Sequence, residues 1–111
     1  MFCYQCEQTA HHTGCTKTAG VCGKKAATAD LQDQLTGALI GLAKTMETST
    51  RPVTDAASAL VVKSLFATLT NVNFDDAALQ ELLEQVHREK KNLILSCPDC
   101  DPPCNEIEDY N

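Results

Sequence analysis

Four cysteines within the first 25 residues constrain the folding of this 111-residue chain more than any other feature. The segment shows no apolar periodicity, and glycines interrupt it at positions 14, 20 and 23. Gaps of two, eight and six residues separate the cysteines, which are Cys3, Cys6, Cys15 and Cys22. An irregular loop of this length in a small domain needs something that holds it in place. Four thiolates on one metal centre would do so, and without the metal we expect the loop to be disordered.

The spacing of these cysteines is compatible with three kinds of thiol site. Structural zinc sites usually join two close pairs of cysteines, whereas six residues lie between Cys15 and Cys22. An iron–sulfur cluster is wider than a single ion and is held by four thiolates, so it accepts wider gaps. The spacing therefore favours an iron–sulfur cluster over zinc, and zinc over redox-active thiols. His11 or His12 could replace a cysteine, as histidines do in Rieske-type centres, but four cysteines leave no need for this.

Lysines are the main charged residues around the loop. Lys17, Lys24 and Lys25 lie in or beside it, against a single acidic residue, Glu7. Positive charge near the sulfurs favours the reduced, more negative form of a cluster. Solubility is the simpler explanation for lysines in a loop, so the sequence leaves both interpretations open.

Composition excludes several classes of partner. The net charge of −6 argues against non-specific nucleic-acid binding and against attachment to an anionic membrane. No run of 18 apolar residues is present that could span a bilayer. The N-terminus lacks the basic and apolar regions of a secretory signal, which predicts a cytoplasmic location. In that compartment the seven cysteines are expected to be ligands rather than disulfides.

The middle of the chain predicts an all-α fold. Large apolar residues recur every three or four positions in three segments, so we expect helices at about 26–48, 55–71 and 75–95. Short connections between these helices predict a three-helix bundle. The chain then divides into a cysteine-rich loop (residues 1–25), the bundle (26–95) and an irregular tail (96–111).

The apolar stripes predict which helix faces are buried. In the first and third helices the stripes comprise Leu31, Leu35, Leu39, Leu42, Met46, Leu79, Leu82, Leu83, Val86 and Leu93. The second helix has a wider stripe, formed by Ala57, Leu60, Val61, Val62, Leu65, Phe66, Leu69 and Val72. We therefore expect the second helix to be the most buried. Side-chain oxygens should cap the helices, from Thr28 or Asp30 in the first and from Thr54 in the second.

The tail is a different kind of segment. It holds three cysteines, three prolines and five acidic residues, without a lysine or arginine. Cys97, Cys100 and Cys104 could bind a second cluster with one open iron, bind zinc with a fourth ligand, or remain thiols. The nearby acidic residues disfavour thiolates and a negative cluster.

Several stretches resemble the hybrid cluster proteins, also called prismane proteins or hydroxylamine reductases. The similar stretches are Met1-Phe-Cys-Tyr-Gln-Cys-Glu-Gln-Thr-Ala10, Gly14-Cys-Thr-Lys17, Gly20-Val-Cys-Gly-Lys24, Leu31-Gln-Asp33 and Leu65-Phe-Ala-Thr-Leu-Thr-Asn-Val-Asn-Phe-Asp-Asp-Ala77. The tail is similar to a linker found in some members. The resemblance covers essentially the whole chain.

The resemblance implies an iron–sulfur cluster for electron transfer. Family members hold a 4Fe–4S cluster, or in one subgroup a 2Fe–2S cluster, through cysteines that match Cys3, Cys6, Cys15 and Cys22. We favour 4Fe–4S, although the last gap here is six residues where five is expected. A hybrid cluster in downstream domains reduces hydroxylamine or nitric oxide in that family, and no counterpart of its ligands occurs in this chain.

The sequence thus predicts an iron–sulfur electron-transfer domain of a hybrid cluster-type oxidoreductase. The isolated chain is not expected to be catalytic alone. The implied partners are an electron donor, the remaining domains of a longer protein and, for an exposed domain surface, a second copy of the chain. The alternatives are a free-standing zinc-binding structural or interaction module and a small iron–sulfur electron carrier.

Overall fold

The computed structural model describes residues 1–7, 10–69 and 74–95, and three α-helices account for most of them. A short 3-10 turn, η1 (Ala10–His12), precedes α1 (Ala26–Thr48), α2 (Asp55–Ala67) and α3 (Asp76–Leu95). The all-α, three-helix prediction is therefore confirmed. The predicted start and end of the first helix are also confirmed, whereas α2 ends before its predicted limit of 71. The predictions for Val72 and for the tail with its three cysteines fall outside the described residues.

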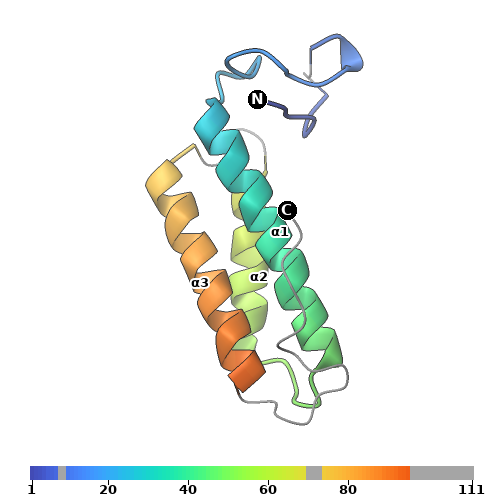
Figure 1. The fold of residues 1–111 in the computed structure, drawn as a ribbon, viewed down its shortest axis with the longest axis vertical. Coiled ribbons are helices and arrows are strands. Elements are labelled where there is room, and N and C mark those ends of the chain that lie inside the picture. Colours follow the sequence, from blue (N-terminus) through green and yellow to red (C-terminus); the bar gives the residue numbers. More distant parts are fainter. Residues whose placement is uncertain (8–9, 70–73, 96–111) are drawn as a thin grey trace.

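The three helices lie side by side, with the cysteine loop at one end (Figure 1). α2 runs antiparallel to both neighbours, so α1 and α3 run in the same direction and both begin at the end that holds the loop. α1 and α3 make the most extensive contact between any two helices of the described chain. None of the described helices is long and apolar enough to cross a membrane.

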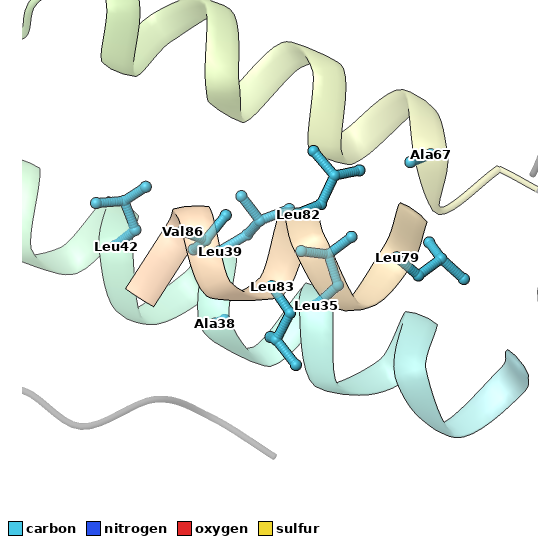
Figure 2. Packing of buried hydrophobic residues seen from close by; sticks show 9 residues of the cluster. All are labelled: Leu35, Ala38, Leu39, Leu42, Ala67, Leu79, Leu82, Leu83 and Val86. Atoms are coloured by element: carbon cyan, nitrogen blue, oxygen red, sulfur yellow. The ribbon is translucent and has the colours of Figure 1, made fainter. Parts of the chain in front are cut away.

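The core lies mainly between α1 and α3 (Figure 2). Four of the nine residues in the buried cluster come from α1, four come from α3, and α2 contributes only one, Ala67. The nine residues are Leu35, Ala38, Leu39, Leu42, Ala67, Leu79, Leu82, Leu83 and Val86. The stripes predicted for the first and third helices are therefore the ones that build the core.

The prediction that the second helix is the most buried is wrong. Its side chains Leu60 and Val61 are half-buried, but Val62 is 67% exposed and Phe66 is 60% exposed. Leu65 and Leu69 are exposed as well. The stripe is wide enough to meet two neighbours, and within the described chain α1 and α3 cover only one side of it. An apolar face of α2 therefore faces away from the core.

The helix starts follow the cap predictions in part. Thr54 caps α2, because its Oγ1 accepts a hydrogen bond from the backbone N–H of Ala57 (3.1 Å). α1 instead begins after Lys25 without a side-chain cap, so the prediction of Thr28 or Asp30 is wrong. Thr28 lies inside the first turn, where its buried hydroxyl donates a hydrogen bond to Asp76 Oδ1 (2.6 Å). This bond joins the starts of α1 and α3 beneath the loop.

Candidate metal centre

Backbone hydrogen bonds bring two of the four cysteines together. Cys3 and Cys15 pair as an isolated antiparallel bridge, with N···O distances of 3.0 and 2.8 Å between their backbones. Gly14 precedes Cys15 with a φ of +94°, a conformation that favours glycine because it has no Cβ. A Cβ at Gly14 would lie 2.7 Å from Cε2 of Phe2. A side chain at position 14 would therefore strain the backbone that pairs Cys15 with Cys3 and displace the exposed Phe2 ring.

A second bridge closes the other half of the loop. Ala19 pairs with Lys25, and the backbone N–H of Gly20 donates to the backbone oxygen of Lys24 (2.8 Å). This turn returns the chain to the start of α1 with Cys22 at its tip. A Cβ at Gly20 would lie 3.4 Å from the Cys22 sulfur, so the backbone passes close to this thiol.

The four cysteines offer a set of thiol donors at one end of the bundle. All four are thiols rather than disulfides; Cys15 is buried, and Cys3, Cys6 and Cys22 are half-buried. Within residues 1–7, 10–69 and 74–95, no three cysteine, histidine or carboxylate side chains gather closely enough to hold one metal ion. A 4Fe–4S cluster instead takes one thiolate on each of its irons. In number and chemistry the donor set fits such a cluster.

Lys24 is a charged residue that the structure places against one of these thiols. Its side chain is only 1% exposed, although lysine is rarely buried in proteins. Its Nζ donates a hydrogen bond to Gln5 Oε1 (3.0 Å) and lies 3.6 Å from the Cys3 sulfur, within hydrogen-bonding range of a thiol. Lys17 and Lys25 are exposed, as expected for lysines that serve solubility. The structure thus separates one buried lysine from two ordinary ones.

The two histidines of the loop are both exposed. His11 and His12 have φ values of 52° and 58°, in the left-handed region that histidine visits more often than most residues. The backbone oxygen of His12 accepts a hydrogen bond from the Tyr4 hydroxyl (3.1 Å), which fastens η1 to the first cysteine pair. In this structure their part is to turn the chain between Cys6 and Cys15.

The start of α1 adds positive potential next to the loop. The N-terminal end of a helix carries about half a positive elementary charge from its aligned peptide dipoles, and Cys22 lies four residues before Ala26, where α1 begins. In the second turn of this helix, burial and the Asp30 carboxylate raise the pKa of Asp33, while Lys24 acts in the opposite direction. The positive charge of Lys24 therefore also acts on the Asp33 carboxyl group.

Sequence reasoning missed Gln5 altogether and did not single out Lys24 from its neighbours. No local pattern marks either residue, because they are 19 positions apart and meet only when the loop closes. The glycines around Lys24 were the available signal, since they allow the backbone to approach the sulfurs closely.

The loop therefore presents four thiols, which are the donor groups of zinc and iron–sulfur sites, at one end of the helical bundle. The chain matches the model of the Prismane/CO dehydrogenase family over residues 1–109, and it belongs to that family. It is 53% identical to the hydroxylamine reductase of Methanocella arvoryzae over 87 residues, which are 77% of this chain and 16% of the relative.

Two further relatives show how much of the chain is matched. The hydroxylamine reductase of Methanococcus vannielii is 41% identical over 110 residues, covering 99% of this chain and 20% of the relative. That of Desulfovibrio desulfuricans is 44% identical over 102 residues, covering 89% of this chain and 18% of the relative. The chain therefore spans about a fifth of the length of these curated relatives. The family resemblance expected from the sequence is confirmed.

Proposed function

We propose that this chain is the electron-transfer domain of a hydroxylamine reductase-type oxidoreductase, with one iron–sulfur cluster on Cys3, Cys6, Cys15 and Cys22. One observation carries the proposal: a loop with four thiols, tied by backbone pairing, encloses a buried lysine ammonium beside one of those thiols. A buried cation is costly unless an opposite charge accompanies it. Asp33 interacts with this charge electrostatically, and thiolate ligands of a cluster would add negative charge in direct contact with the ammonium.

The chain's own residues would hold and orient the cluster. A 4Fe–4S cluster supplies one-electron transfer when bound, and a 2Fe–2S cluster is the alternative. The Cys3–Cys15 pairing sets two of the ligands side by side, and the Gly20–Lys24 turn carries Cys22. Binding of the cluster would draw these three cysteines and Cys6 together. Three of the four thiols are half-buried, so an electron donor would reach the site over a short distance.

The reduction of a substrate would take place elsewhere. In the described chain, the loop is the one set of side chains that we assign to a redox centre, and a hybrid cluster is not expected here. We therefore propose that the cluster passes electrons to the remaining domains of a longer chain, since the chain spans 16–20% of the relatives' lengths. Cytoplasmic location and the lack of a nucleic-acid partner stay predictions.

The exposed face of α2 supports a domain contact of this kind. Val62, Leu65 and Phe66 of α2, with Leu69 just beyond its end, follow a helical i, i+3, i+4, i+7 pattern and expose an apolar stripe, the α2 face. Beside it, a groove of about 330 Å³ runs between α2 and α3, lined by Phe66, Ala67, Ala78, Leu82 and the polar residues Lys63, Glu81 and Gln85. We propose that the remaining domains of the longer protein cover this face.

Anaerobic purification tests the cofactor. The protein should be brown, absorb visible light and contain about four irons and four sulfides per chain. A colourless protein with about one zinc and no iron would instead support a zinc-binding structural module.

Two cysteine substitutions test the ligands. Cys6→Ser should abolish the visible absorption and the bound iron, because it removes one of four thiolates. Cys100→Ser is the matched control and should keep the iron, since Cys100 lies outside the loop. Loss of iron in Cys100→Ser would show that the ligand assignment is wrong.

A further inference from the structure

We propose that Lys24 is a positioning residue that raises the reduction potential of the cluster, through a buried ammonium group hydrogen-bonded to the ligand Cys3. This inference rests on the proposed function, because it concerns the cluster assigned to the loop. It adds a residue that contacts a ligand without being one. The alternative is that Lys24 only fastens the loop together.

The charge of Lys24 is buried, which needs a compensating negative charge. Lys24 is as fully enclosed as the core leucines, at 1% exposure. The two polar atoms that its ammonium contacts are an uncharged amide oxygen of Gln5 and the Cys3 sulfur. The Asp33 carboxylate interacts with this charge electrostatically, but neither group in hydrogen-bonding range of the ammonium is a carboxylate, and a buried ammonium without a charged partner in contact is unfavourable. The arrangement is favourable when Cys3 is a thiolate bound to iron.

Lys24 lies between the two ends of the cysteine loop. The Lys24 Cβ and the Cys22 sulfur both lie beside Gly20. A Cβ added to Gly20 would be 3.5 Å from the Lys24 Cβ and 3.4 Å from the Cys22 sulfur. Its Nζ reaches Cys3, 21 residues earlier. The side chain therefore extends from the neighbourhood of the last ligand to the first one. A cluster held by these cysteines would lie directly beside the ammonium.

A positive charge at Lys24 should raise the reduction potential of the cluster. Reduction adds one negative charge to the cluster, and a buried positive charge beside a sulfur stabilises that added charge. Hydrogen bonds to the sulfurs act in the same direction. The buried position also limits screening by salt, whereas an exposed lysine is screened strongly. Lys24 should therefore favour the reduced state, and the exposed Lys25 should contribute little.

The test compares Lys24→Met with Lys25→Met in the anaerobically prepared, cluster-loaded protein. The two variants remove the same charge from neighbouring positions, one buried and one exposed. Potentiometric titration followed by electron paramagnetic resonance gives the reduction potential. We expect Lys24→Met to lower the ratio of reduced to oxidised cluster about tenfold at a given potential. For a one-electron couple this is a shift of about 59 mV towards negative values.

The outcomes separate this inference from the proposed function. Lys25→Met should shift the potential far less, and Lys24→Arg, which keeps the charge, should recover part of the loss. An unchanged potential in an iron-loaded Lys24→Met protein would overturn the role of Lys24 and leave the electron-transfer proposal standing. A wild-type protein without a cluster would overturn the proposed function itself.

A second measurement covers the case in which Lys24 variants fail to fold. Wild-type protein is labelled with ¹⁵N at the lysine side chains, and the reduced cluster is studied by electron–nuclear double resonance. The ammonium beside Cys3 should give a ¹⁵N coupling that persists in Lys25→Met. Absence of this coupling from the wild-type protein would overturn the contact.

Discussion

Individual residues decide whether the cysteine loop can close, and Gly14 is the clearest example. Its φ of +94° costs an L-residue about 1–2 kcal/mol. A side chain would also collide with the Phe2 ring, and the Cys3 oxygen lies 3.3 Å from the same Cβ position. Both effects act on the peptide that pairs Cys15 with Cys3.

We expect Gly14→Ala to reduce the cluster content of the protein severalfold. Gly23→Ala provides a matched control, because Gly23 has a φ of +87° but nothing within 4 Å of an added Cβ. Gly23→Ala should show only the strain of a positive φ, without a steric clash, and should therefore lose less iron than Gly14→Ala. Gly20→Ala should be tolerated best, since its nearest contacts are of ordinary van der Waals length. Iron and sulfide analysis measures all three, and equal loss in every variant would contradict the steric explanation.

Lys24 and Gln5 show where residue-level prediction stops. The sequence alone identifies the four thiols, because cysteines with metal-ligand spacing are a local pattern. It does not distinguish Lys24 from Lys17 and Lys25, because burial depends on how the loop folds over the side chain. The same limit applies to Thr28, which was predicted as a cap and instead donates a hydrogen bond to Asp76 in another helix.

Among the helices, α2 differs most from its prediction, and Ser64 is the polar residue on its buried side. The Ser64 side chain is fully buried, and among the described residues its hydroxyl has no hydrogen-bond partner. A buried hydroxyl without a partner costs about 1–3 kcal/mol. Alanine also has a higher helix propensity than serine.

Ser64→Ala should therefore raise the free energy of unfolding by about 1 kcal/mol. Urea denaturation of the purified chain, followed by circular dichroism, measures the change. Ser58→Ala, at an exposed position of the same helix, should give only the smaller gain in propensity. A loss of stability in Ser64→Ala would show that the hydroxyl is hydrogen-bonded in solution.

At the scale of the whole molecule, the α2 face is the feature that the three helices leave uncovered. Its apolar residues have the spacing of a core stripe, yet four of them are more than half exposed: Val62, Leu65, Phe66 and Leu69. Contiguous exposed apolar surface of this kind marks interaction sites. In isolation the chain should therefore use this face to associate with itself.

We expect the purified chain to show concentration-dependent association that Val62→Ser with Phe66→Ser removes. The double substitution should change the unfolding free energy little, because both side chains are already exposed in the monomer. Sedimentation velocity measures the association. Val53→Ser, at an exposed apolar position in the connection between α1 and α2, is the control and should leave it unchanged. Association that survives the double substitution would exclude the α2 face as the contact surface.

The sequence by itself determined the local features of this protein. Helical periodicity placed three helices, with approximate limits for α1 that agree with the observed ones, because this pattern depends on neighbours three or four residues away. The four-cysteine loop was equally visible, since ligand spacing is local. Only the tertiary structure decided which apolar stripe is buried, because a stripe is covered or exposed according to what packs against it. It also decided that one lysine of the loop is enclosed beside Cys3, which depends on contacts between residues far apart in the chain.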